Sequence, residues 1–296
     1  MKNIPIPSRD SVRDDLIKSI ATYTYKKELL GHTITEDEID QVLAIYDRYD
    51  ADQGVASNAL KGTGFPQALI DALQAAFDKT QEKRKLYPLR QRLFEGVDLC
   101  PICGITPPVE LDHFLPRSKF KPLAIYPRNL VPLCHACNHT KLAGFGDQDD
   151  EAAGFLHAYF DIIPDEQFLE ADVDIQHGAL IVTFNISVDA ELPEGYANRL
   201  SRQITSLKLN DRYEREVNSY ISSHAVALHL QHNVGGRDFV ISFLELQARY
   251  ERRQFYRNHW RPTLLGALAR YDEFTDGGFK DVLPLPDDVL DDIADL

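Results

Sequence analysis

The placement of four cysteines constrains this chain more than any other feature of its sequence. They form two pairs, Cys100-Pro-Ile-Cys103 and Cys134-His-Ala-Cys137, separated by thirty residues. In such a pair both thiolates can face one metal ion, and two pairs supply the four ligands of a tetrahedral zinc site. Each zinc–sulfur distance in such a site is about 2.3 Å. Four thiolates leave no open coordination position, so we expect a structural zinc ion rather than a catalytic one. The alternative interpretation is a redox dithiol, or cysteines that are buried and inert.

The cysteines lie in a basic segment of an acidic chain. The formal net charge is −14, from 32 Lys and Arg against 46 Asp and Glu. Between residues 83 and 145 there are ten basic and four acidic side chains, so this basic segment carries +6 and the rest of the chain −20. A negative net charge normally disfavours a nucleic-acid partner, but a concentrated basic segment can still bind phosphates.

Length and composition are those of a globular protein. The chain has 296 residues, enough for two domains and for three small ones, with 44% hydrophobic and 10% aromatic residues to form cores. No apolar run approaches the roughly 18 residues of a transmembrane helix, and no signal peptide is visible. We therefore expect a cytoplasmic protein that does not associate with membranes.

The hydrophobic pattern predicts an α+β fold. Helical periodicity covers three segments. The first is residues 11–30, the second begins with a capping box at Thr35 and Glu38, and the third runs from Pro66 to about residue 85. Alternating residues around His177-Gly178 predict a β-hairpin, and three helical stretches and an acidic tail follow it. We divide the chain into a helical region (1–90), a zinc-stabilised ββα module (91–146) and a C-terminal α+β region (147–296).

Polar residues between and after the cysteine pairs complete a motif. Asp112-His113 is followed after sixteen residues by Asn129, and Asn138 comes nine residues later. With the cysteines, the segment from Cys100 to about residue 142 resembles the HNH nuclease motif of the ββα-metal superfamily, in its zinc-bearing form. The aromatic segment His157–Asp161 that follows is similar to one in HNH nucleases of bacterial anti-phage systems of the Septu and retron-associated kind.

The chemistry of phosphodiester hydrolysis suggests roles for these residues. His113 is the expected general base, because an imidazole titrates near neutral pH and can take a proton from water. The resemblance implies that Asp112 and Asn138 are ligands of a catalytic metal and that Asn129 braces the loop and orients the histidine. Carboxylate and amide oxygens favour Mg²⁺ or Mn²⁺. Leu142 stands where some family members have a further histidine, so we expect two protein ligands.

Other polar side chains in the module receive weaker assignments. Arg117, Lys119 and Arg128 are expected to contact phosphates, and Lys141 either does so or holds its helix in place. His135 and His139 are assigned to the surface or the surroundings of the zinc. His157 and Asp161 could form a second acid–base pair, but core packing is the preferred interpretation.

These assignments predict a metal-dependent HNH endonuclease that cuts DNA as the effector of an anti-phage system, with a protein partner such as an ATPase. One alternative is a non-catalytic zinc-ribbon module that binds nucleic acid or protein. Another is an HNH nuclease that acts on RNA. The acidic helix near the C-terminus (285–296) is expected to be a solvated helix, with the alternative that it covers the basic segment as a phosphate mimic.

Overall fold

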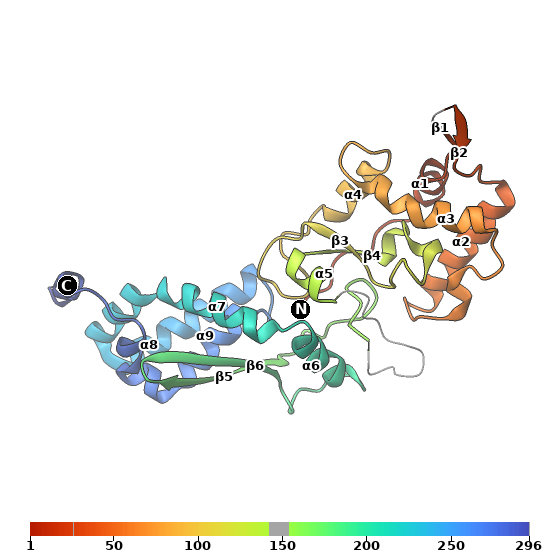
Figure 1. Ribbon diagram of the computed structural model, residues 1–296. Helices are drawn as coiled ribbons and strands as arrows, with labels where there is room; N and C mark the ends of the chain where they lie inside the picture. The colour runs from red at the N-terminus through yellow and green to blue at the C-terminus, as the bar shows by residue number, and fades with distance from the viewer. Residues whose placement is uncertain (26, 142–153, 296) are drawn as a thin grey trace. The chain divides into compact units, whose positions relative to one another are not determined.

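The computed structural model describes residues 1–25, 27–141 and 154–295, which form two compact units (Figure 1). The N-terminal unit comprises residues 2–163, and the C-terminal unit comprises residues 164–296 together with Met1. The division expected at residue 90 does not separate units, because it falls inside helix α4 (Tyr87–Phe94). The division expected at 146 lies outside the described residues.

One hydrophobic core runs through the whole N-terminal unit. It joins buried side chains of the first helices, such as Leu16 and Leu73, to side chains from the segment between the cysteine pairs, such as Leu111 and Leu130. The helical region and the ββα module therefore stabilise each other, which is why the boundary between them is not a domain boundary. The elements before the module are α1 (Val12–Ser19), β1 (Tyr23–Tyr25), β2 (Glu28–Leu30), α2 (Glu36–Ala51), η1 (Asn58–Lys61), α3 (Gln67–Ala76) and η2 (Phe77–Thr80).

Two of the predicted helices end earlier than expected. The helix predicted over 11–30 stops at Ser19, and the short antiparallel strands β1 and β2 follow it. The run Ala21-Thr-Tyr-Thr-Tyr25 is rich in β-branched and aromatic residues, which favour strands, and this local preference outweighs the helical spacing. Helix α3 likewise passes into the 3₁₀ turn η2, and the extended backbone of Gln81 ends that turn.

The predicted capping box opens helix α2. The Thr35 hydroxyl accepts a hydrogen bond from the Glu38 backbone N–H at 3.3 Å, and the Glu38 carboxylate accepts one from the Thr35 N–H at 2.9 Å. The helix ends in a turn at Gly54, whose N–H donates to the Tyr49 carbonyl at 2.9 Å. Between these ends α2 carries Tyr46, Tyr49 and Asp50 toward the module.

The module itself is two antiparallel strands followed by a helix. Strand β3 (Glu110–His113) pairs with β4 (Leu130–Leu133), with Asp112 opposite Val131. A single residue, Cys134, separates β4 from helix α5 (His135–Lys141). The connection between the strands contains two 3₁₀ turns, η3 (Lys121–Leu123) and η4 (Pro127–Asn129). The mixture of helices with small antiparallel sheets confirms the α+β class.

The C-terminal unit is built on the predicted hairpin. Strand β5 (Leu169–Gln176) pairs with β6 (Ala179–Ile186) through a two-residue turn, where His177 and Gly178 have φ of 52° and 76°. One face of the hairpin is buried against the unit's helices (Figure 1). The remaining elements are α6 (Tyr196–Ser206), α7 (Leu209–Ser222), α8 (Ala225–Gln254), α9 (Trp260–Arg270), the π turn η6 (Phe274–Gly278), α10 (Phe279–Val282) and α11 (Asp287–Ala294).

The acidic helix α11 packs by its apolar side within its own unit. Ile293 is buried, and its carbonyl accepts a hydrogen bond from the Asn233 amide of α8 at 3.0 Å. The first-turn carboxylates of Asp287 and Asp288 are exposed. This agrees with a solvated terminal helix.

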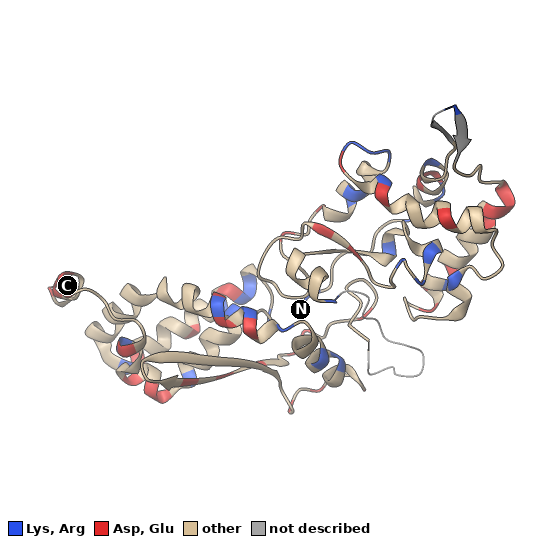
Figure 2. Cartoon of the chain, viewed as in Figure 1, with Lys and Arg blue, Asp and Glu red and all other residues tan. Residues whose placement is uncertain are grey.

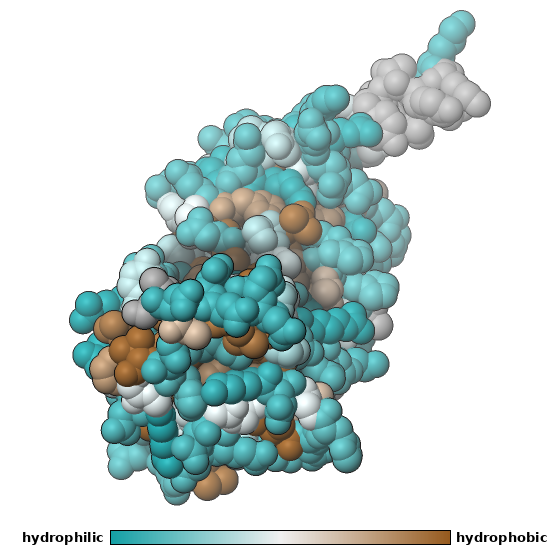
Figure 3. All heavy atoms as spheres, turned by 90° about the vertical axis from the view of Figure 1, so that its left-hand side faces the viewer, coloured by the Kyte–Doolittle hydropathy of each residue, from teal (hydrophilic) through white to brown (hydrophobic). Residues whose placement is uncertain are grey.

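The surface is polar with scattered apolar side chains. Acidic and basic side chains are interspersed over the elements of each unit (Figure 2). On the face seen in Figure 3, hydrophobic side chains form separate groups within a mainly hydrophilic surface. Among the described helices, none has the length and apolar character needed to cross a membrane.

Candidate functional site

The four cysteines come together in the N-terminal unit as the sequence predicts. All four are buried, and their sulfur atoms lie within 4.8 Å of one another. The Sγ atoms of Cys103 and Cys134, one from each pair, are 3.7 Å apart. Such a cluster of four thiols could hold one zinc ion in tetrahedral coordination. The thiols affect one another unequally, since the hydrogen bond with Cys100 lowers the pKa of Cys103 to about 7 while burial raises the pKa of Cys100.

Local backbone geometry prepares both cysteine pairs as ligands. The Cys103 sulfur accepts a hydrogen bond from the Ile105 N–H, and the Cys134 sulfur accepts one from the Cys137 N–H, each at 3.5 Å. The first turn requires Gly104, whose φ of 64° lies in the left-handed region. N–H groups aimed at sulfur stabilise negative charge there, so the two turns support a bound cation.

Asp112 forms a buried ion pair with Lys141. The Lys141 Nζ atom lies 2.8 Å from Asp112 Oδ2, and both side chains are about 95% buried. The ammonium also donates hydrogen bonds to the carbonyls of His113 and Phe114 at 3.1 and 3.4 Å. Through these contacts the Lys141 side chain connects α5 to the end of β3.

Asn138 contacts the carboxylate of Glu110, whereas the resemblance implies that it shares a metal ion with Asp112. Its Nδ2 atom donates to Glu110 Oε2 at 2.6 Å, and the other Glu110 oxygen lies 2.7 Å from His135 Nδ1. These contacts lower the pKa of Glu110, the hydrogen bond from Asn138 most of all. Within the residues the structure covers, Asp112 and Asn138 share no hydrogen bond. Glu110 and Asp112 are two positions apart on β3, so both carboxylates face α5.

His113 is the last residue of β3. Its Nε2 atom is 2.9 Å from the Ala124 carbonyl oxygen, and its ring packs edge-on against Phe77 with the ring centroids 4.4 Å apart. A carbonyl can only accept, so Nε2 carries the proton and Nδ1 retains a lone pair. Burial lowers the pKa of His113 to about 4, below the near-neutral value expected from the sequence, so the imidazole is neutral at pH 7 but is a weaker base than a free one.

Asn129 is fully buried and closes the loop between the strands. Its Oδ1 atom accepts a hydrogen bond from the Leu115 N–H at 2.8 Å. Its Nδ2 atom donates to the carbonyls of Leu115 and Leu123, at 3.1 and 3.2 Å. This amide thus connects the end of β3 to the turn that presents the Ala124 carbonyl.

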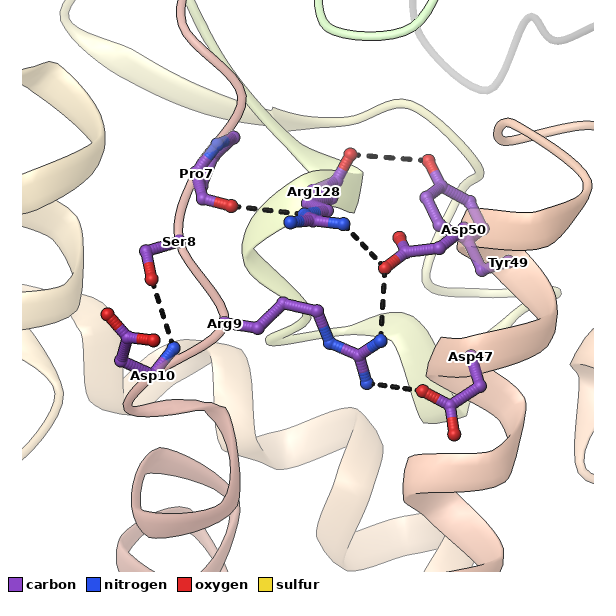
Figure 4. A network of polar contacts seen from close by, with 8 residues as sticks. All are labelled: Pro7, Ser8, Arg9, Asp10, Asp47, Tyr49, Asp50 and Arg128. Atoms are coloured by element: carbon purple, nitrogen blue, oxygen red, sulfur yellow. Dashed lines mark hydrogen bonds and ion pairs between the residues drawn. The ribbon is translucent and has the colours of Figure 1, made fainter.

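The side chains expected to contact phosphates differ in their availability. Lys119 is exposed, and Arg117 pairs with exposed Asp78 at 3.1 Å. Arg128 is held inside a polar network, donating to the Pro7 carbonyl at 3.0 Å and to Asp50 Oδ2 at 2.6 Å (Figure 4). Arg9 binds the same Asp50 oxygen at 3.3 Å (Figure 4). Arg128 therefore stabilises the loop that carries Asn129, and Arg117 and Lys119 are better placed for a ligand.

Three side chains with oxygen donors lie between β3 and α5. Carboxylate oxygens of Asp112 and Glu110 and the amide oxygen of Asn138 are the ligand types that Mg²⁺ and Mn²⁺ prefer. The Lys141 ammonium competes for Asp112, because it already compensates the charge of that carboxylate. Leu142, the position of the absent histidine, lies outside the described residues.

Three residues at the site were given no functional role from the sequence. Glu110 could have been found by strand alternation, because it is two residues before Asp112 on the same face. Tyr49 lies on a helix 80 residues before Asn129, and its hydroxyl contacts both Asn129 and His157. No local pattern signals either contact, since each depends on how distant segments pack.

Comparison with known proteins identifies a similar phage protein. No protein-family model matches the sequence, and no solved structure matches it. This chain is similar to protein ea31 of Escherichia phage lambda. The two sequences are 25% identical over 213 residues, which is 68% of this chain and 70% of that protein. The name of this relative states no activity, so the chemistry has to be argued from the site.

Proposed function

We propose that this chain is a metal-dependent endonuclease of the HNH type that hydrolyses DNA phosphodiester bonds. The observation that supports it most is the state of His113, on a ββα scaffold next to a buried cluster of four cysteines. The hydrogen bond that Nε2–H donates to the Ala124 carbonyl keeps the ring proton on Nε2 and leaves the Nδ1 lone pair to act as the base. Loss of such a base from a hydrolase typically costs a factor of about 10² to 10⁴ in rate.

In this proposal the chain's residues divide the work at the end of β3. His113 takes a proton from the attacking water at Nδ1, and Asn129 keeps the loop that orients it in place. Asp112, Glu110 and Asn138 would hold Mg²⁺ or Mn²⁺, which supplies charge neutralisation at the scissile phosphate when bound. Arg117 and exposed Lys119 would contact flanking phosphates, and these contacts carry no sequence information.

A second candidate function is a non-catalytic zinc module that binds nucleic acid or protein. The buried ion pair between Asp112 and Lys141 favours it, because an internally compensated carboxylate has less affinity for a metal. An HNH nuclease acting on RNA is the third candidate. In each case we propose that a protein partner, such as an ATPase of a defence system, directs the chain to its target.

Cleavage assays with two kinds of variant test the proposal. Purified protein is incubated with plasmid DNA or RNA in Mg²⁺, in Mn²⁺ and in EDTA. We expect DNA cleavage that EDTA abolishes, and a His113→Ala variant that retains its zinc and melting temperature but cuts roughly 10²–10⁴ times more slowly. Cys100→Ser should instead lose zinc and unfold, since zinc–thiolate binding contributes about 10 kcal/mol or more in small zinc fingers.

The outcomes separate the candidates. Cleavage of RNA but not DNA would support the third candidate. A zinc-loaded His113→Ala variant that cuts at the wild-type rate would overturn the mechanism. Binding of nucleic acid without cleavage under all metal conditions would support the zinc-module alternative.

A further inference from the structure

Two buried side chains from outside the Cys100–Lys141 segment reach the loop that holds His113. Tyr49 comes from α2, and His157 comes from the segment after the module. Tyr49 and Asn129 are 0% exposed and His157 is 1% exposed. Hydrogen bonds connect the three polar groups in series, with the Tyr49 hydroxyl 2.9 Å from His157 Nε2 and 3.2 Å from Asn129 Oδ1.

The partners determine the direction of each hydrogen bond in this series. The Tyr159 backbone N–H donates to His157 Nδ1 at 3.1 Å, so Nδ1 is the acceptor and the proton of the neutral ring is on Nε2. His157 Nε2–H therefore donates to the Tyr49 oxygen. The Tyr49 hydroxyl then donates to Asn129 Oδ1, or at 3.4 Å to the Arg128 carbonyl (Figure 4).

The series of hydrogen bonds continues from Asn129 to His113. Asn129 accepts a hydrogen bond from the Leu115 N–H and donates one to the Leu123 carbonyl. Ala124 follows Leu123, and its carbonyl accepts a hydrogen bond from the His113 Nε2–H. A second contact is direct packing, since the rings of His157 and Phe114 have centroids 4.0 Å apart and Phe114 adjoins His113. His157 thus supports the base from two sides.

Close packing keeps the His157 ring in this position. A Cβ atom at Gly54 would lie 2.7 Å from His157 Cδ2, and the φ of 82° at Gly54 is in the left-handed region. The backbone turn at the end of α2 therefore packs directly on the imidazole, and only glycine allows this approach. His157 is further anchored where its backbone N–H donates to Asp161 Oδ2 at 2.6 Å.

We infer that Tyr49 and His157 are positioning residues for His113. They fix the orientation of Asn129, and through the Ala124 carbonyl they keep His113 in the tautomer with a lone pair on Nδ1. The inference rests on the proposed nuclease function for its kinetic consequence. Its structural consequence, the tautomer of His113, can be measured whether or not the protein cuts DNA.

The sharpest variant is Tyr49→Phe, because it removes one hydroxyl and keeps the ring. We expect kcat to fall about ten-fold with KM within about two-fold of wild type, because one orienting hydrogen bond is lost and no substrate contact is. The matched control is Tyr46→Phe, one turn earlier on α2. The Tyr46 hydroxyl is buried and has no hydrogen-bond partner among the described residues, and its ring stacks on Tyr126, so this variant should keep the wild-type kcat.

A spectroscopic measurement makes the test independent of activity. Two-bond ¹H–¹⁵N spectra distinguish the histidine tautomers, and the His113 signal is assigned by its loss in His113→Ala. We expect the Nε2–H tautomer in wild type and in Tyr46→Phe, and a mixture of tautomers in Tyr49→Phe. His157→Gln, which keeps an N–H donor, should retain more activity than His157→Leu.

The two proposals fail in different ways. If Tyr49→Phe keeps both the wild-type kcat and the wild-type His113 tautomer, the positioning inference is wrong and the nuclease proposal stands. If wild type cuts no substrate but Tyr49→Phe shifts the tautomer, the positioning is upheld and the proposed function is wrong. If Tyr46→Phe lowers kcat as much as Tyr49→Phe does, general packing of α2 explains the effect and the inference is overturned.

Discussion

Single buried polar residues determine how the module holds together. Asp112, Asn129 and Lys141 are each at least 95% buried, and each finds its partners inside the fold. Burying an ionic pair costs desolvation energy that its mutual attraction only partly offsets, so such a pair is tolerated rather than strongly stabilising. Removing one member, however, leaves an uncompensated charge in the interior.

Lys141→Met tests this at residue scale. The substitution leaves the Asp112 carboxylate buried without its cation and should lower the free energy of unfolding by about 3–5 kcal/mol. Adding Asp112→Asn removes the charge, so the double variant should be less destabilised than Lys141→Met alone. Chemical denaturation measures the free energy of unfolding of the single and the double variant.

An exposed ion pair provides the control for this experiment. Arg48 and Asp52 lie one turn apart at the end of α2, with Arg48 Nε 2.6 Å from Asp52 Oδ2. The Arg48 side chain is 60% exposed. Arg48→Met should cost about 1 kcal/mol or less. Equal losses in the single and double Asp112–Lys141 variants would show that the buried charge is not the cause.

At the scale of elements, glycines mark where the backbone leaves ordinary geometry. Helix α8 is interrupted at Gly235 and Gly236, and Gly236 has φ 62° and ψ −147°, a conformation that is essentially restricted to glycine. An added Cβ at Gly236 would meet no atom within 4 Å. The requirement for glycine there is therefore one of backbone conformation and not of space.

Gly236→Ala should consequently destabilise the C-terminal unit by about 1–3 kcal/mol. The matched variant is Gly266→Ala on α9, where φ is ordinary and a Cβ would make only van der Waals contacts, at 3.5 Å, with two arginine side chains. Alanine is the better helix former by about 1 kcal/mol, so Gly266→Ala should stabilise the unit. Thermal unfolding compares the two variants, and the same sign for both would contradict this account.

At the scale of the whole molecule, the charge distribution limits binding to nucleic acid. Of the ten basic side chains between residues 83 and 145, three form ion pairs with buried or half-buried carboxylates, namely Arg92, Arg128 and Lys141, whereas Arg117 pairs with an exposed one. At most about seven can contact phosphates, while the rest of the chain carries −20 and repels a duplex over a Debye length of about 8–10 Å.

The protein by itself should therefore bind DNA weakly and with strong salt dependence. Each phosphate contact contributes about −0.9 to the slope of log K against log salt, so the slope should be no steeper than about −6. Fluorescence anisotropy over a salt series measures it. Nanomolar affinity that persists in about 0.3 M salt would contradict this expectation and the need for a partner.

Features set by neighbouring residues could be predicted from the sequence. The spacing of Cys100, Cys103, Cys134 and Cys137 predicted the cluster of four thiols, and the capping box at Thr35 and the hairpin turn at His177-Gly178 were predicted from short patterns. In each case a few adjacent residues determine the geometry, so no long-range contact is needed. The helix predicted across residues 20–30 was wrong, because local strand preference competed with helical spacing there.

The sequence by itself thus determined the α+β class, the thiol cluster and the order of polar residues around His113, because each follows from local spacing and alternation. Only the tertiary structure decided that Lys141 pairs with Asp112, that Asn138 contacts Glu110, and that Tyr49 and His157 meet at Asn129. Those contacts join segments that are distant along the chain. Which distant side chains meet depends on how the whole core packs, and no short pattern in the sequence records that.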